Sequence, residues 1–187
     1  MTMTFHSATL KDKDTIFEWL DNPHVQEFWD NSPQHRQDIE NFMGGRQTRS
    51  PYFGGMNSYW VGLLDNHPYA FIITHEESEK TDPPEIYKPY ISKTGKTFGI
   101  DFCIGSKNHL GKGLAAPTLK AFMHYFIKAV EPKTDIFYID PFINNPRAIH
   151  VYQKAGFKIV SEFTQQGGFF DQSKGVLMIK EISSEQI

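Results

Sequence analysis

The chain has 187 residues, 39% hydrophobic and 22% charged, a composition typical of one globular domain. Its net charge is −3 and it has no dense run of Lys or Arg, so the sequence does not predict a nucleic-acid-binding protein. The single cysteine, Cys103, excludes an internal disulfide, and the apolar runs are too short to cross a bilayer. The N-terminus also has no charged-then-apolar signal segment. We therefore expect residues 1–187 to form one cytoplasmic domain without a membrane or nucleic-acid partner.

The first half of the chain predicts three strands and two helices. A helix begins after Asp12 or Asp14, either of which can cap it, and Asn22-Pro23 ends it. A short apolar patch that includes Trp29 follows, and Ser32-Pro33 opens the second helix. Asp65 to Pro68 predicts a hairpin turn. The strands are expected at 4–10, 59–64 and 69–74, and the helices at about 12–20 and 33–43.

The second half predicts four short strands and two amphipathic helices. Pro117 is compatible with the first of these helices only if the helix begins close to Ala115 or Ala116, because proline has no N–H to donate. Asn145 can cap the second helix, Pro146 can be its first residue, and Gly156 can end it. The strands are expected at 98–104, 135–140, 158–163 and 176–180, and the helices at about 115–130 and 146–155.

Residues 75–97 show no sustained period and are rich in acids. One interpretation is a solvated surface loop. The other is a substrate-facing loop whose negative charge attracts an amine. The acids are Glu76, Glu77, Glu79, Asp82 and Glu85.

A glycine-rich turn joins the 98–104 strand to the helix that follows. The first N–H groups of a helix have no intrahelical partner and point in one direction, so a turn of this kind can hold an anion. Gly111 and Gly113 would let a phosphate approach the backbone, and Lys112 adds positive charge. The spacing matches neither the P-loop nor the G-x-G-x-x-G pattern. From this turn alone, a plain tight turn between strand and helix is as reasonable as an anion site.

A second motif favours the anion site. Asn145, Ala148 and Tyr152 form an Asn-x-x-Ala-x-x-x-Tyr pattern before Gly156-Phe157. With the glycine-rich turn, this resembles the GCN5-related N-acetyltransferases, in which a (Gln/Arg)-x-x-Gly-x-(Gly/Ala) segment wraps the pyrophosphate of acetyl-CoA. Leu110, Gly113 and Ala115 stand at its positions, although Leu110 departs from the usual Gln or Arg. The resemblance implies an α/β fold with a mixed, twisted sheet of about six or seven strands, flanked by helices.

Several segments sharpen the resemblance toward the aminoglycoside 6'-N-acetyltransferases. These are residues 19–29, the Gly99-Ile100-Asp101 strand, the Leu-Gly-Lys-Gly-Leu turn and Asp140-Pro141. The N-hydroxylysine acyltransferases of siderophore synthesis are similar but less so, because they typically carry His-Leu-Leu-Ile-Gly where this chain has Asp101 to Gly105. The resemblance implies acetyl transfer from acetyl-CoA to a primary amine of a small polycationic molecule. Antibiotic acetylation could then be incidental to the natural role.

Acyl transfer to an amine requires removal of a proton, because an alkylamine with a pKa of about 10 is protonated at neutral pH. On the strand, Asp101 points away from Ile100 and Phe102, so this acid faces a wet or functional space or finds a partner. Asp101 is our candidate base; the alternative is a structural acid paired with a cation or a backbone N–H. The family pattern makes Tyr152 the acid that protonates the departing thiolate, and the alternative is a core tyrosine.

The resemblance also implies a binding set around these two residues. Backbone N–H groups near Ile104 would polarise the thioester carbonyl. Asp140 and Trp29 match substrate-contacting positions, although a packed aromatic is an equally good interpretation of Trp29. The implied acetyl-CoA contacts are Ile104, Leu110, Gly111, Lys112, Gly113, Leu114, Ala115, Asn145 and Tyr152, and the implied amine contacts are Trp29, Asp101 and Asp140.

Other chemistry finds little support in the sequence. The eight histidines are scattered without metal-ligand spacing, so we expect no metal. Cys103 has no evident His partner and reads as a small buried side chain. Besides the two acyltransferase interpretations, a catalytically silent acyl-CoA-binding module remains open, because Leu110 lacks the usual polar group. The sequence leaves a monomer and a homodimer equally open.

Overall fold

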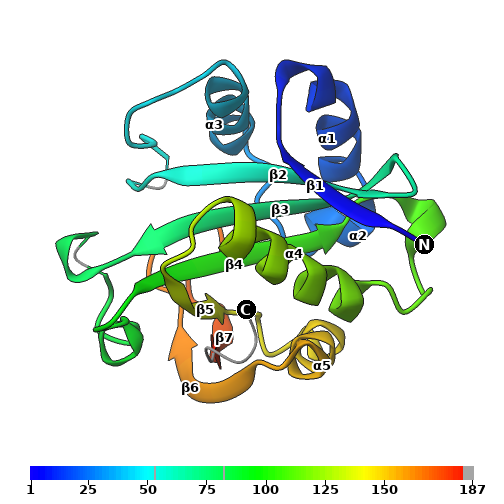
Figure 1. Cartoon of the computed structure of the whole chain (residues 1–187). Coiled ribbons are helices and arrows are strands. Elements are labelled where there is room, and N and C mark those ends of the chain that lie inside the picture. Colours follow the sequence, from blue (N-terminus) through cyan, green and yellow to red (C-terminus); the bar gives the residue numbers. More distant parts are fainter. Residues whose placement is uncertain (53, 82, 183–187) are drawn as a thin grey trace. The chain divides into compact units, whose positions relative to one another are not determined.

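The computed structural model describes residues 1–52, 54–81 and 83–182. The chain divides into two compact units, Met1–His75 with Asp101–Thr118, and Glu76–Ile100 with Leu119–Ile187. The strands are β1 (Met3–Ser7), β2 (Asn57–Leu64), β3 (His67–Glu77), β4 (Lys96–Ile104), β5 (Thr134–Ile139), β6 (Lys158–Thr164) and β7 (Lys174–Glu181) (Figure 1). The α-helices are α1 (Lys13–Leu20), α2 (Pro23–Gln26), α3 (Pro33–Met43), α4 (Ala115–Ala129) and α5 (Pro146–Ala155), and the 3₁₀ turns are η1 (Leu10–Asp12), η2 (Glu79–Thr81), η3 (Lys88–Tyr90) and η4 (Lys107–His109).

The strands of the first unit form an antiparallel meander. β1 pairs with β2 from Met3↔Leu64 onward, and β2 pairs with β3 across the predicted hairpin. Asp65 and Asn66 occupy that turn with φ angles of 47° and 67°. Two left-handed residues are what a two-residue hairpin of matching twist requires, and Asp and Asn tolerate this conformation better than most side chains.

The core of the first unit lies between its helices and one face of β2 and β3. Alternate strand residues face the helices, as the two-residue period of a strand dictates. On α1 the apolar side chains recur at spacings of three and four, which places them on one helix face. The buried set is Ile16, Trp19 and Leu20 of α1, Val25 of α2, Ile39 and Met43 of α3, and Tyr59, Val61, Phe71 and Ile73 of the strands.

The second unit combines parallel and antiparallel pairing. β4 runs parallel to β5 from Lys96↔Thr134 to Gly99↔Tyr138, whereas β7 is antiparallel to both β5 and β6. The Phe126 ring of α4 lies 4.9 Å from Phe98 and 5.9 Å from Phe137, measured between ring centroids. These aromatic contacts pack α4 against β4 and β5.

All seven predicted strands are present among the described residues, and the predicted class is confirmed: an α/β fold with a mixed seven-stranded sheet flanked by helices. In strand order the first unit supplies β1, β2 and β3 up to His75, the second supplies β5-β7-β6, and β4 is divided between the units after Ile100. The expectation of one domain for residues 1–187 stays a prediction. No helix within the described ranges is long and apolar enough to cross a membrane.

The end of the first strand was predicted wrongly, and one short helix was missed. β1 ends at Ser7 and not at residue 10, because the Asp12 carboxylate accepts the Thr9 N–H at 2.8 Å and turns the chain into η1. Asn22-Pro23 does end α1, but it also opens the one-turn helix α2, with Pro23 as its first residue.

Candidate functional site

The C-terminal half of β4 alternates as predicted. Ile100 and Phe102 are buried, with 1% and 7% of their surface exposed, whereas Asp101 and Cys103 are half-buried on the opposite face. Cys103 packs against the core of the first unit, and the charge of Asp101 contributes to raising the pKa of Tyr59 in that core. Asp101 therefore faces the side of β4 that carries α1 to α3.

Cys103 is unsuited to thiolate chemistry. Burial raises its pKa to about 12, and the nearby Asp101 carboxylate acts in the same direction. The thiolate is the reactive form of cysteine, so this thiol is inert at neutral pH. The interpretation of Cys103 as a small packed side chain agrees with this environment.

The glycine-rich turn lies at the N-terminus of α4. Gly111 and Gly113 have φ angles of 72° and 71°, and a Cβ at either position would meet nothing within 4 Å. Glycine is thus favoured by conformation, and the space beside the turn is open. Lys112 is exposed between the two glycines, and Leu114 is buried.

The start of α4 is fixed by side chains from the same unit. The Thr118 hydroxyl donates to the Leu114 carbonyl at 2.7 Å, and it also hydrogen-bonds the buried Tyr69 hydroxyl at 2.6 Å. Pro117 is the third residue of the helix, within the first turn, where a backbone N–H has no intrahelical acceptor. The turn from Leu110 to Ala115 thus has the left-handed glycines, helix terminus and positive charge that suit an anion.

Trp29 lies on the same face of the first unit as Asp101. Its ring is half-buried and 5.5 Å from Phe71 between centroids, and it packs against the core of this unit. Both interpretations of Trp29 fit this position, because the ring packs on Phe71 and part of it stays open to solvent.

Asp140 follows β5 and is held by a tyrosine that the sequence analysis missed. The Tyr87 hydroxyl donates to the Asp140 carboxylate at 2.8 Å, and the Tyr87 ring lies 4.9 Å from that of Tyr138. Burial raises the pKa of Asp140, and the hydrogen bond from Tyr87 opposes that rise. No periodic signal links residues 87 and 140, so the sequence alone could not have paired them.

The acidic segment 75–97 is mostly paired. Glu76 and Glu131 both bind the Lys96 ammonium, at 3.1 and 2.7 Å, and Glu85 pairs with Lys88. Glu77 accepts hydrogen bonds from Thr81 at 2.7 Å and from Tyr138 at 3.4 Å, while burial raises its pKa. Asp82 lies outside the described residues.

Helix α5 carries the second motif. The Asn145 side chain accepts the Ala148 N–H at 3.0 Å, which makes it the predicted N-cap, and Gly156 ends the helix with a φ of 102°. Tyr152 is 8% exposed, and its ring lies 6.4 Å from Phe157 between centroids. Asp140, Asn145 and Tyr152 all belong to the second unit, whereas Trp29, Asp101 and residues 110–115 belong to the first. The roles assigned to these residues stay predictions.

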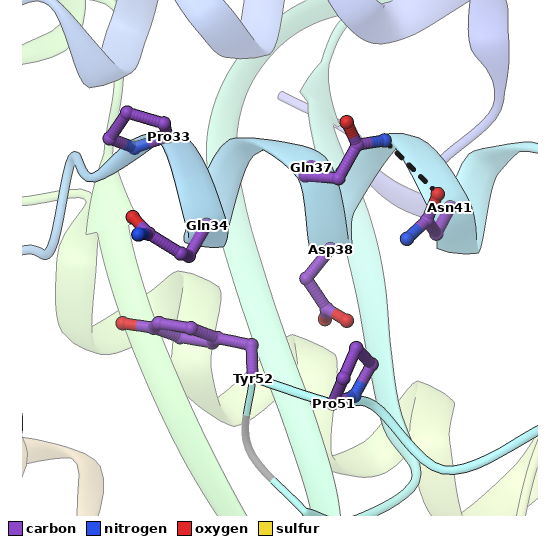
Figure 2. Close-up of a pocket in the computed structure, with 7 residues that line it drawn as sticks. All are labelled: Pro33, Gln34, Gln37, Asp38, Asn41, Pro51 and Tyr52. Atoms are coloured by element: carbon purple, nitrogen blue, oxygen red, sulfur yellow. Dashed lines mark hydrogen bonds between the residues drawn. The ribbon is translucent and has the colours of Figure 1, made fainter.

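A separate pocket of about 460 Å³ lies in the first unit, and no predicted site residue lines it. Figure 2 shows it between α3 and the loop that precedes β2, with Gln37 donating to Asn41 at 3.1 Å. The carboxylate of Asp38 at this pocket binds Arg46 and accepts hydrogen bonds from Ser50 and Tyr59 at 2.5 and 2.6 Å. Its charge is therefore neutralised, and the pocket presents mainly amides, prolines and Tyr52. The lining residues are Pro33, Gln34, Gln37, Asp38, Asn41, Pro51 and Tyr52.

Comparison with known proteins places the chain among acetyltransferases. It is 24% identical over 173 residues to the aminoglycoside N(6')-acetyltransferase type 1 of Klebsiella pneumoniae, which covers 89% of this chain and 79% of that protein. It is similar to the crystal structure of an aminoglycoside N(6')acetyltransferase from Legionella pneumophila, with a TM-score of 0.73, 23% identity, and 95% and 90% of the two chains covered.

A third relative was solved with ligands. The aminoglycoside acetyltransferase AAC(6')-Ib, in complex with coenzyme A and kanamycin, matches with a TM-score of 0.73 and 20% identity over 99% of this chain and 96% of that one. At this identity the likeness establishes the fold. The family model described as an acetyltransferase (GNAT) domain matches residues 8–165, most of the chain. The protein therefore belongs to the GNAT acetyltransferase family.

Proposed function

We propose that this protein transfers an acetyl group from acetyl-CoA to a primary amine of a small polycationic molecule, as an aminoglycoside 6'-N-acetyltransferase does. The observation that carries the proposal is the open turn at Gly111 and Gly113 before α4, in a chain of the acetyltransferase family. Such a turn suits the pyrophosphate of acetyl-CoA. The protein acts on a small molecule in the cytoplasm, as a monomer or a homodimer, without nucleic acid, membrane or metal.

The cofactor is held chiefly by main chain. The amides from Gly111 to Ala115 contact the pyrophosphate, and the Ile104 N–H polarises the thioester carbonyl. Lys112 adds a favourable charge. Leu110 contributes no polar group, so we expect the backbone to supply the affinity that Gln or Arg supplies in the family pattern. Leu114 anchors the turn from its buried position, and the capped start of α5 at Asn145 completes the set.

Asp101 serves as the base. A carboxylate with an ordinary pKa of about 3.9 is a weak base toward an ammonium of pKa about 10. The Asp101 carboxylate therefore binds the substrate ammonium and relays the proton of that ammonium to water. The amine nitrogen adds to the acetyl carbon to give a tetrahedral oxyanion, and the bond from that carbon to sulfur breaks as the carbonyl forms again. Tyr152 then donates its hydroxyl proton to the departing thiolate, and the second proton that the nitrogen loses as the amide forms restores the Tyr152 hydroxyl by way of water.

The acceptor is recognised by negative charge and an aromatic surface. The Asp140 carboxylate, fixed by Tyr87, attracts a second ammonium of the substrate. Trp29 offers its partly open ring to the apolar side of the acceptor. An acceptor with several ammonium groups can contact both the Asp140 carboxylate and the Trp29 ring, which is why we favour a polycation.

The test measures thiol release from acetyl-CoA with a panel of acceptors: kanamycin, spermidine and an N-hydroxylated diamine. We expect turnover with the polyamino acceptors and little with the hydroxylamine. Preference for the hydroxylamine, or for an octanoyl over an acetyl donor, would favour the siderophore branch. Absence of a thermal shift with CoA would overturn both enzyme proposals, and a shift without turnover of any acceptor would favour a silent acyl-CoA-binding module.

A further inference from the structure

Three side chains from the N-terminal helices meet the backbone at the end of β4. His24 Nε2 lies 3.0 Å from the Ile104 carbonyl oxygen, and Asn22 Nδ2 donates to the Gly105 carbonyl oxygen at 3.1 Å. The Trp19 ring covers Gly105 so closely that a Cβ there would lie 2.2–2.5 Å from indole atoms. All of these residues belong to the first unit.

The amides of this segment are already engaged on the β3 side. The Gly105 and Ser106 N–H groups both donate to the Tyr69 carbonyl oxygen, at 2.9 and 3.2 Å. Neither amide is therefore directed at a thioester. Because successive residues of a strand present their N–H and C=O groups to opposite edges, the Ile104 N–H points away from β3. Ile104 thus has the amide that can polarise an acyl carbonyl.

His24 lies on the edge of β4 to which the Ile104 amide points. The N–H and C=O of one strand residue share an edge, and the His24 ring binds the Ile104 C=O. The imidazole must carry its proton on Nε2 to donate this bond. Without that donor, the partial negative charge of the Ile104 carbonyl oxygen would lie uncompensated near the thioester oxygen, which gains negative charge in the reaction.

Asn22 fixes the next peptide unit. It occupies the N-cap position of α2, yet its side chain makes no capping bond and instead reaches the Gly105 oxygen from a site 7% exposed. With His24, Asn22 and Tyr69 in place, two consecutive peptide units have both their C=O and N–H groups bound. The direction of the Ile104 amide then depends only on the torsions of Ile104 itself.

We propose that His24 and Asn22 are positioning residues, which orient the peptide units at Ile104 and Gly105 so that the Ile104 N–H meets the developing oxyanion. This inference rests on the proposed acetyl transfer. His24 binds the Ile104 carbonyl oxygen and offsets its negative charge, and Asn22 binds the Gly105 carbonyl oxygen and fixes the orientation of that peptide plane. Neither residue exchanges a proton with the substrate.

The test compares His24→Ala, His24→Gln and Asn22→Asp with wild type. Glutamine can place an N–H donor near the position of Nε2, and aspartate keeps the shape and capping ability of asparagine but loses the donor. His124→Ala is the matched control, because His124 is exposed on α4. We expect kcat to fall about tenfold or more in His24→Ala and Asn22→Asp, less than the loss of a direct oxyanion donor, with the KM for acetyl-CoA within about twofold of wild type. His24→Gln should recover most of the rate.

The second readout is the carbonyl stretch of bound acetonyl-CoA, a non-transferable ketone analogue of the thioester. We expect wild type and the His124→Ala control to lower its frequency, and His24→Ala to lower it less. Unchanged kcat and frequency in His24→Ala, or equal losses of rate and melting temperature in the Ala and Gln variants, would overturn the inference while acetyl transfer stands. If wild type binds no CoA, the proposed function and this inference fall together.

Discussion

The candidate residues of the two units differ in kind. In the first unit the features that matter are in the main chain: the left-handed glycines 111 and 113, the start of α4, and the Ile104 amide. In the second unit they are side chains held by other side chains, as the Asp140 carboxylate is held by the Tyr87 hydroxyl. We propose that these main-chain features bind the acyl-CoA donor and that the Asp140 carboxylate binds the acceptor.

Asp101 is the residue of the first unit whose side chain, rather than its backbone, is expected to matter most. We expect Asp101→Asn to lower kcat/KM for the amine by about 10² to 10⁴-fold, because the amide cannot accept a proton from the ammonium. Released thiol measures the rate at saturating acetyl-CoA. Glu18→Gln, at an exposed position of α1, should leave it unchanged. Equal rates in Asp101→Asn and wild type would contradict the assignment of Asp101 as the base.

Tyr152 is the side chain of the second unit that would act on the donor. Tyr152→Phe keeps the ring against Phe157 but removes the hydroxyl. We expect kcat to fall about tenfold or more, since the thiolate must then leave without its proton donor. A matched measurement with an acyl donor of lower thiol pKa should recover part of the rate. No loss with CoA would return Tyr152 to the role of a core tyrosine.

Tyr87→Phe tests whether the Asp140 carboxylate acts on the acceptor alone. The variant leaves the half-buried Asp140 without its hydroxyl donor, which costs about 1–3 kcal/mol and raises the pKa of that carboxyl further. We expect the KM for the amine to rise about tenfold at neutral pH and the KM for acetyl-CoA to stay the same. A change confined to the KM for acetyl-CoA would contradict the assignment of Asp140 to the acceptor. Tyr90→Phe, on the same segment, is the control.

His75 gives the smallest expected effect and concerns stability. Burial lowers its pKa to about 4, well below the value of about 6.5 in an unfolded chain. Between pH 6.5 and 4 the unfolded chain binds more protons, so this group makes the folded state less stable as pH falls. We expect the free energy of unfolding, measured with urea, to fall less between pH 7 and pH 4.5 in His75→Gln than in wild type. An equal fall in the free energy of unfolding in both proteins would contradict a lowered pKa of His75 in the folded state.

The sequence predicted the main-chain features better than the side-chain ones. The helix start near Ala115, the Asn145 cap and the alternation of Asp101 with Phe102 follow from local rules, and the structure confirms all three. The contact of Tyr87 with Asp140 spans 53 residues, and that of Asn22 with Gly105 spans 83. Such pairs depend on tertiary packing, which no local pattern encodes.

The most direct test of the account is a calorimetric titration of CoA into wild type and Gly113→Val. A branched side chain at a φ of 71° is strained, and it would occupy the open space beside the turn where the pyrophosphate is expected to bind. The account predicts one CoA site in wild type and at least about tenfold weaker binding in the variant, measured at a temperature where both free proteins are fully folded, because the strain at this φ also lowers the melting temperature of the variant. Equal CoA affinity in the two proteins would contradict it.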